Sequence, residues 1–258
     1  GNVGKWQKFA NSLRLKLAMV IADVDPGTAG AKIAASAALP LITANADNAL
    51  FKYVGAPNNN PLSNDVPPRS ARQDFVMANT LVDEMNTLND PRRAAYFTTV
   101  GGEYVGGKYG FSNVYANFST FSTKVTATTF PGNMLDASEV NFLLAEAVER
   151  GFITGDAKSY YDAAITASLA YWGVTGVEDY LAQATVDYSN AGSGASWQEK
   201  IGTQKWIALY NRGFDAWTEW RRLDFPVLVA PDASGVPPIP KRLIYPIIEN
   251  SLNAANTK

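Results

Sequence analysis

Apolar residues recur at helical spacing in two adjacent stretches near the middle of the chain. In 137–150 they follow the order expected of one helix face, namely Val140, Leu143, Leu144, Ala147 and Val148. In 156–174 a second face comprises Tyr160, Ala164, Ile165, Leu169 and Trp172. Ser138 is a candidate N-cap of the first helix, and Asp156 of the second. The short turn between them predicts antiparallel packing, and the small-aromatic-small order of Ala157, Tyr161 and Ala164 is typical of a tetratricopeptide second helix.

The same periodicity predicts further helices over 5–22, 72–88 and 196–223, and a shorter one in the Ala-rich stretch 29–38. For 5–22 the predicted apolar face is Trp6, Phe9, Leu13, Leu17, Val20 and Ile21. For 72–88 it is Phe75, Ala78, Val82 and Met85. Gly213 is expected to divide the last segment, which Ser196 caps. The sequence therefore predicts a mainly α fold built from tetratricopeptide-like helix pairs.

Two segments have no helical period. Residues 94–136 mix closely spaced aromatics with Gly, Ser, Thr and Asn, which predicts a long irregular loop with at most a short β-hairpin. Residues 226–258 are rich in Pro and are expected to wrap the surface as a tail. We expect one domain over 1–258. Because so apolar a helix opens the chain, we also expect these residues to be the later part of a longer protein.

Composition excludes several classes of chemistry. The chain has no cysteine and no histidine, so disulfides, thiolate nucleophiles, Cys/His zinc sites and Ser-His-Asp triads are ruled out. The formal net charge of −2 provides no basic field for nucleic acid. No EF-hand loop is present, and the glycines at 101–110 match no phosphate-binding motif. We predict neither a cofactor nor a metal.

Carboxylates are the main acid–base groups that remain. Glu139 and Glu146 flank the apolar face of 137–150 and are expected to be solvated edges rather than a catalytic pair. We predict that the protein is not an enzyme. A carboxylate-dependent glycosidase stays an alternative, as does a helical-repeat module that binds a protein or peptide, whose sign would be an exposed apolar patch on the helices.

The aromatic loop is the best candidate for binding. Sugar rings lay their C–H faces on aromatic side chains, while amides and carboxylates hydrogen-bond the hydroxyls. The candidate ligand-binding residues are Tyr96, Tyr104, Tyr109, Asn113, Tyr115 and, after a flexible loop, Trp197. The alternative for each aromatic residue is that it pins the loop onto the helices.

Several segments together resemble the SusD/RagB family of starch-binding-associated outer-membrane lipoproteins. They are KWQKFANSLRLKLAM, PLITANADNALFKY, NDPRRAAYF, YVGGKYG, SEVNFLLAEAVERG with AKSYYDAAITASLAYWGV, IGTQKWIALYNRGFDAWTEWRRLDFPVL and PKRLIYPIIENSLNAAN. The resemblance covers most of the chain and is to the C-terminal portion of such proteins. It implies a non-catalytic glycan-binding protein at the bacterial cell surface, on the outer membrane, that passes oligosaccharides to a SusC-type TonB-dependent transporter. Membrane attachment would come only through a lipid anchor absent from this chain.

Overall fold

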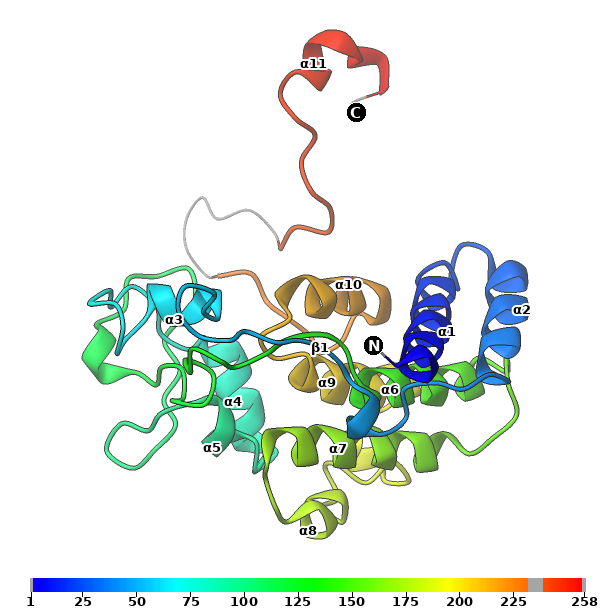
Figure 1. Ribbon diagram of the computed structural model, residues 1–258, viewed down its shortest axis with the longest axis horizontal. Helices are drawn as coiled ribbons and strands as arrows, with labels where there is room; N and C mark the ends of the chain where they lie inside the picture. The colour runs from blue at the N-terminus through cyan, green and yellow to red at the C-terminus, as the bar shows by residue number, and fades with distance from the viewer. Residues whose placement is uncertain (1, 232–238, 257–258) are drawn as a thin grey trace. The chain divides into compact units, whose positions relative to one another are not determined.

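The computed structural model describes residues 2–231 and 239–256, which fall into two compact units, Gly1–Pro226 and Val227–Lys258. The first unit is mainly helical (Figure 1). Its α-helices are α1 (Val3–Val20), α2 (Pro26–Ala37), α3 (Pro61–Asp65), α4 (Asn79–Thr87), α5 (Arg93–Tyr96), α6 (Ala137–Glu149), α7 (Ala157–Trp172), α8 (Val177–Leu181), α9 (Trp197–Ala208) and α10 (Gly213–Leu223). In the second unit the described residues include α11 (Glu249–Leu252).

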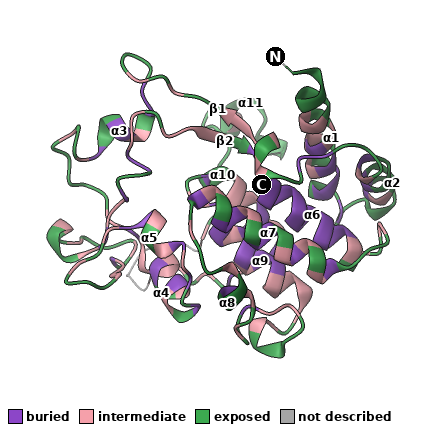
Figure 2. Cartoon of the chain, turned by 60° about the horizontal axis from the view of Figure 1, so that its bottom comes forward, coloured by how far each residue is buried: buried purple, intermediate pink, exposed green. Residues whose placement is uncertain are grey.

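Helices α6 and α7 form the centre of the first unit, and they pack against each other as the predicted antiparallel pair. Every residue from Ala137 to Ala147 is buried, so α6 is enclosed along nearly its whole length (Figure 2). One side of α6, including Phe142, joins a core shared with α4, α7 and α9. The other side, including Leu143, joins a second core shared with α1 and α2. The position of α6 between two cores explains its complete burial.

The two central helices begin at aspartates. Asp156 caps α7, where its carboxylate accepts hydrogen bonds from the backbone N–H groups of Lys158 and Ser159, as predicted. The prediction that Ser138 caps α6 was wrong, because Asp136 is the cap and accepts from the Glu139 N–H at 2.8 Å. Ser138 is buried two residues after the cap, and its hydroxyl donates to the Ala164 carbonyl of α7 at 2.8 Å. Ser138 therefore ties the two helices together.

Replacing Asp156 by alanine is expected to lower the free energy of unfolding by about 1 kcal/mol, because two N–H groups in the first turn of α7 lose their acceptor. Urea denaturation followed by circular dichroism measures the change. Thr154→Ala, at an exposed position two residues earlier, is the matched control and should change stability by less than about 0.5 kcal/mol. Equal effects of the two substitutions would mean that the cap does not stabilise α7.

Helix α1 is present as predicted, but of the predicted face only Phe9 and Leu13 pack against the second core, and the other four residues are exposed. Trp6 and Leu17 are 66% and 61% exposed, and Val20 and Ile21 are exposed as well. The buried residues of α1 are Ser12, Leu15, Ala18 and Met19. Polar side chains explain the rotation: the Ser12 hydroxyl accepts from the Ile42 N–H at 2.9 Å, and the Lys16 ammonium pairs with buried Glu139 at 2.9 Å. These two partners turn a polar edge inward and leave an apolar stripe outside.

Helix α4 starts later than predicted, at Asn79 rather than near residue 72. The residues before it pair with distant segments instead of forming a helical turn. The Met77 N–H donates to the Ser119 carbonyl and the Asn79 N–H to the Gly107 carbonyl, both at 2.8 Å. Val82 and Met85 are buried as expected, whereas Phe75 lies outside the helix and is 45% exposed.

The predicted loop 94–136 is largely irregular, and its strand pairs outside the segment. Strand β2 (Gly132–Leu135) lies antiparallel to β1 (Ala49–Phe51), with Ala49 opposite Leu135. This two-stranded sheet is a long-range pairing. Inside the loop, Val100 and Glu103 form an isolated antiparallel bridge around a two-residue turn, in keeping with the expectation of at most a short hairpin there. Gly213 divides the last helical segment into α9 and α10 as predicted. The surface-wrapping role of the tail 226–258 stays a prediction, and residues 232–238 of it lie outside the described residues.

Candidate functional site

Tyr96 is a core residue, so its prediction as a ligand contact was wrong. Its side chain is fully buried, and its ring stacks on that of Tyr210 with the centroids 4.1 Å apart. The Tyr96 hydroxyl donates to the Ile207 carbonyl of α9 at 3.1 Å. Tyr96 closes the short helix α5, which turns its ring toward α7 and α9 and away from solvent.

The other three loop tyrosines are partly exposed. Tyr104 packs edge-on against Phe97 at 6.4 Å between centroids, with the Arg93 guanidinium 5.4 Å from its ring. Tyr109 and Tyr115 also keep part of their rings at the surface. The Tyr109 hydroxyl has no hydrogen-bond partner among the described residues. Packing therefore uses only part of each ring, and ligand binding by these tyrosines stays a prediction.

Backbone pairing brings the aromatic segments together. The Gly107 N–H donates to the Met77 carbonyl and the Ser119 N–H to the Val105 carbonyl, both at 2.8 Å, so three stretches lie side by side. Glycine is required at this contact, because a Cβ on Gly106 would lie 2.3 Å from the Cα of Asn79. The glycines near 106 serve close packing of backbone. We call the partly exposed rings of these stretches the aromatic face: Phe75, Tyr104, Tyr109, Phe111 and Tyr115.

Asn113 holds the shape of the loop. Its side-chain oxygen accepts from the Lys108 N–H at 3.1 Å, and its amide nitrogen donates to the carbonyls of Lys108 and Phe111 at 3.0 and 2.9 Å. These bonds close the turn that presents the ring of Phe111, which is 39% exposed. Because its polar atoms are already engaged, Asn113 positions the aromatic face.

Arg72 and Phe75 lie beside Tyr115 and were not predicted as site residues. A shallow hollow is lined by Tyr115, Phe121, Phe75 and Arg72, among others. The Arg72 guanidinium lies 5.4 Å from the centroid of the Phe75 ring. Helical periodicity had placed Phe75 in a buried helix face. The polar, Pro- and Asn-rich stretch 55–70 just before it was the available signal that the chain enters a loop region.

Trp197 lies apart from the other candidates. It opens α9, and its ring packs against the core with the Arg150 guanidinium 5.2 Å from its centroid. Arg150 follows the end of α6, so this contact belongs to different elements from the loop tyrosines. The structure does not group Trp197 with the aromatic face.

Glu139 and Glu146 are buried, so their prediction as solvated edges of a helix was wrong. Their side chains are 0% exposed. The Glu139 carboxylate pairs with Arg212 at 2.5 Å and with Lys16 at 2.9 Å. Glu146 pairs with Arg150 at 2.7 Å and also with Arg222. Because cores surround α6 on both sides, its polar residues face ion-pair partners inside the protein.

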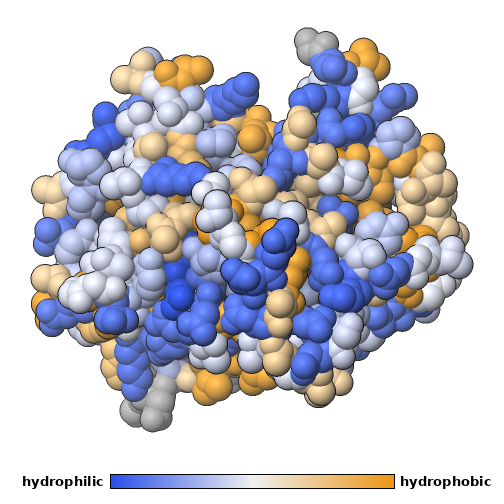
Figure 3. Space-filling model, turned by 90° about the horizontal axis from the view of Figure 1, so that it is seen from below, coloured by the Kyte–Doolittle hydropathy of each residue, from blue (hydrophilic) through white to orange (hydrophobic). Residues whose placement is uncertain are grey.

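The described residues offer no metal site and no membrane helix. Within 2–231 and 239–256, no group of three or more acidic side chains is arranged to hold a metal ion. None of the helices in that part of the chain combines the length and the apolar character needed to cross a bilayer. On the face seen in Figure 3, hydrophilic residues cover most of the centre, and hydrophobic residues gather in smaller groups between them.

Helix pairs that carry a long aromatic loop define a helical-repeat scaffold suited to binding. The chain belongs to the SusD-like family described as starch-binding and associating with the outer membrane, whose model matches residues 1–246. The sequence resemblance is thereby confirmed. The family description associates its members with the outer membrane.

Solved structures of SusD-like proteins share the fold. A SusD homologue from Bacteroides uniformis is 33% identical with a TM-score of 0.82, and 99% of this chain covers 61% of that one. A SusD-like protein from Bacteroides thetaiotaomicron is 31% identical with a TM-score of 0.80, at 99% and 60% coverage. A chitin-binding SusD homologue from Flavobacterium johnsoniae is 28% identical with a TM-score of 0.81, also at 99% and 60%. The chain thus spans about three fifths of the length of these proteins. The comparison with curated proteins gave no match.

Proposed function

We propose that this chain belongs to a non-catalytic glycan-binding protein of the bacterial cell surface. It captures oligosaccharides or polysaccharide on the aromatic face and passes them to a SusC-type TonB-dependent transporter in the outer membrane. The observation that carries the proposal is the grouping of partly exposed rings on neighbouring segments of a SusD-like scaffold. The starch-binding family description and the chitin-binding relative support a glycan as the ligand.

The chemistry of the aromatic face suits a neutral glycan. Tyr115, Phe75 and Phe111 offer ring surface to the C–H faces of sugars, and this contact needs no charge on the ligand. The exposed Arg72 guanidinium can donate hydrogen bonds to sugar hydroxyls. On a surface of this kind, several modest contacts together supply the free energy of binding.

The surroundings of the carboxylates support binding without catalysis. A glycosidase uses two carboxyl groups that reach the scissile bond. Glu139 and Glu146 are instead enclosed in α6 and paired with guanidinium groups. The protein-binding alternative draws support from one feature, the exposed apolar stripe on α1 that includes Trp6 and Leu17.

Removing one ring from the aromatic face is expected to weaken glycan binding about fivefold, the equivalent of about 1 kcal/mol. Tyr115→Ala and Phe75→Ala are the variants, and native gel retardation by soluble starch and by glycol chitin measures affinity. Phe51→Ala, which removes a ring 58% exposed on β1, is the matched control and should bind as the wild type does.

Reducing-sugar release on the same mixtures separates a binder from an enzyme. Retardation without release supports the proposal. Release of sugar would establish the glycosidase alternative. If neither glycan retards the wild-type protein, glycan binding is contradicted and the protein-binding alternative through α1 is favoured. Trp6→Ala should then weaken the binding of the protein to the transporter in a pull-down.

A further inference from the structure

Helix α1 carries an apolar stripe that faces solvent. Its members follow one another in alternating steps of three and four residues: Val3, Trp6, Ala10, Leu13, Leu17 and Val20. All except the half-buried Leu13 are exposed, Val3 at 77% and Trp6 at 66%. The opposite side of the same helix, including Leu15 and Met19, packs in the second core. Helix α1 is therefore apolar on two opposite sides, and the described residues cover only one of them.

The spacing of the stripe selects an α-helix as its occupant. Alternating steps of three and four residues are a heptad pattern, in which the side chains of one helix fit between those of a second helix that crosses at about 20°. A bilayer surface would instead take a broad apolar face bordered by free basic side chains. On α1, Lys8 already pairs with Asp47 at 2.5 Å, and Lys16 with Glu139 at 2.9 Å. The stripe therefore suits a helix better than a bilayer.

A groove at the start of the stripe provides room for one large side chain of such a helix. It measures about 340 Å³ and lies between Trp6 and Phe9 of α1 and Leu50 and Met134 of the two-stranded sheet. Met134 is itself 58% exposed, so the apolar surface continues from α1 onto β2. A second helix laid along the stripe would therefore contact the sheet as well as α1.

The charge of α1 selects an acidic helix. Residues 3–20 include four basic side chains and no acidic one. Arg14 is exposed beside the stripe and forms no ion pair with any of the described residues. Two copies of α1 packed on each other would bring like charges together, which disfavours a dimer through this helix. A helix with acidic residues beside its own apolar positions would instead pair with Arg14.

We propose that the apolar stripe is the docking surface for an α-helix with acidic flanks, which belongs to the part of the SusD-like fold outside these 258 residues. The relatives from Bacteroides uniformis and Bacteroides thetaiotaomicron match 99% of this chain over only 61% and 60% of their own length, so the fold contains further chain that can supply the helix. A helix joined to the same protein has a high effective concentration, which favours its packing here. The proposal does not depend on glycan binding.

Fluorescence anisotropy of a labelled synthetic peptide of three heptads tests the proposal on the whole chain. The peptide has Leu at its a and d positions and Glu at e and g, and a matched peptide has Lys at e and g. We expect the Glu peptide to bind at least about tenfold more tightly than the Lys peptide. Leu17→Ala should weaken binding of the Glu peptide about tenfold, because a side chain that is now 61% exposed would be buried in the complex.

Charge reversal and a matched control complete the test. Arg14→Glu should weaken binding of the Glu peptide about fivefold and strengthen that of the Lys peptide. Val114→Ala, at an apolar position 66% exposed on another segment, should bind both peptides as the wild type does. Overlapping peptides of about four heptads from the unmatched part of the Bacteroides uniformis homologue locate the natural helix, because the peptide that contains its counterpart should displace the Glu peptide.

Other results overturn the proposal at different steps. Equal binding of the Glu and Lys peptides overturns the selection by charge, and binding that Leu17→Ala leaves unchanged overturns the role of the stripe. Absence of binding by both peptides overturns the docking surface. A dimer in sedimentation equilibrium that Leu17→Ala dissociates assigns the stripe to a second copy of the chain. Binding of the Glu peptide that no homologue peptide displaces overturns the assignment of the helix to the SusD-like fold.

Discussion

Asp90→Ala is expected to lower the free energy of unfolding by about 3–5 kcal/mol, because it leaves the charge of Arg92 buried without a carboxylate. Both side chains are 0% exposed, and the Arg92 Nη2 lies 2.5 Å from Asp90 Oδ2. Arg92 also donates to Ser168 at 3.0 Å and to Gln204 at 2.9 Å. The Tyr180 hydroxyl donates to Asp90 at 2.9 Å. The remaining partners are neutral, so they cannot replace the lost charge.

The exposed pair of Arg72 and Asp74 provides the control for this prediction. Their side chains are 51% and 55% exposed and lie 2.7 Å apart, so Asp74→Ala should change stability by less than about 1 kcal/mol. Guanidinium denaturation of the three proteins measures both changes. Similar small losses for both variants would show that the Asp90–Arg92 pair does not stabilise the first unit.

The Asp90–Arg92 network also shows where sequence reasoning stops. The turn at residues 89–91 was predictable, because Asn, Asp and Pro are turn residues. Burial of Arg92 was not, because its partners Ser168 and Gln204 stand on α7 and α9, far along the chain. A local pattern carries no information on which distant polar groups meet.

The orientation of a helix was predictable where a single apolar face packs on one core. It was less predictable where the helix packs on more than one neighbour. In 137–150 the helix was found, but α6 lies between two cores, so Glu139 was wrongly expected at the surface. In α1 the apolar stripe with Trp6 was correctly recognised, yet Ser12 and Lys16 find partners inside and reverse the orientation. Apolar spacing fixes which residues share a face, and tertiary partners fix where that face points.

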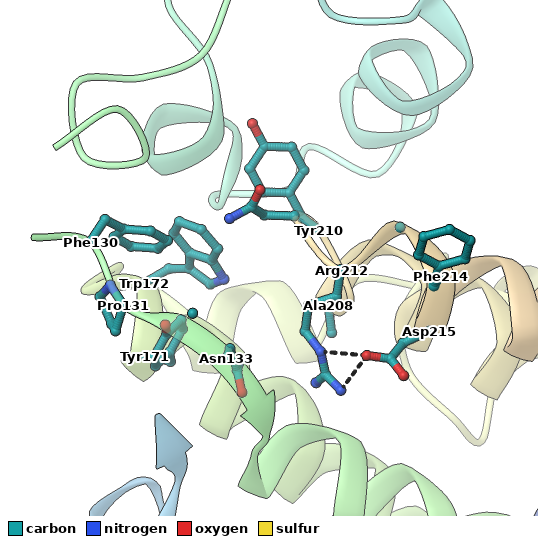
Figure 4. Close-up of a pocket in the computed structure, with 13 residues that line it drawn as sticks. Phe130, Pro131, Asn133, Tyr171, Trp172, Ala208, Tyr210, Arg212, Phe214 and Asp215 are labelled. Atoms are coloured by element: carbon teal, nitrogen blue, oxygen red, sulfur yellow. Dashed lines mark hydrogen bonds and ion pairs between the residues drawn. The ribbon is translucent and has the colours of Figure 1, made fainter. Parts of the chain in front are cut away.

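The aromatic loop was recognisable from composition, whereas the exposure of each ring was not. Tyr96 and Tyr104 stand in similar sequence surroundings, but α5 turns Tyr96 into the core beside Tyr210. A cavity lined by Phe130, Trp172 and Phe214 (Figure 4) gave no sequence signal, because its walls come from α7, the segment of β2 and α10, which lie far apart along the chain. Trp172 was assigned to the core from its helical spacing, and it is both a core residue and a wall of that cavity.

Glu219 makes the stability of the fold depend on acid pH. Burial alone would raise the pKa of its carboxyl, but the positive charges of Lys205 and Arg222 outweigh burial and lower the pKa to about 2 from an ordinary 4.5. The Lys205 Nζ lies 2.6 Å from Glu219 Oε2. Because the folded state holds the proton less tightly than the unfolded chain, the stabilisation is complete above about pH 4.5 and is lost as the pH falls toward about 2.

Replacing Glu219 by glutamine should therefore lower the free energy of unfolding by roughly 3 kcal/mol at pH 7, since each tenfold difference in proton affinity between the folded and unfolded states corresponds to about 1.4 kcal/mol. Thermal unfolding at pH values from 7 to 2.5 measures the difference between the two proteins. The difference should shrink below about pH 4.5, because acid then protonates Glu219 in the unfolded wild-type chain while the folded carboxyl is still ionised. Glu103→Gln, at an exposed position, should follow the wild type throughout. A difference that stays constant across this range would show that lost packing or hydrogen bonding, rather than the charge of Glu219, is responsible.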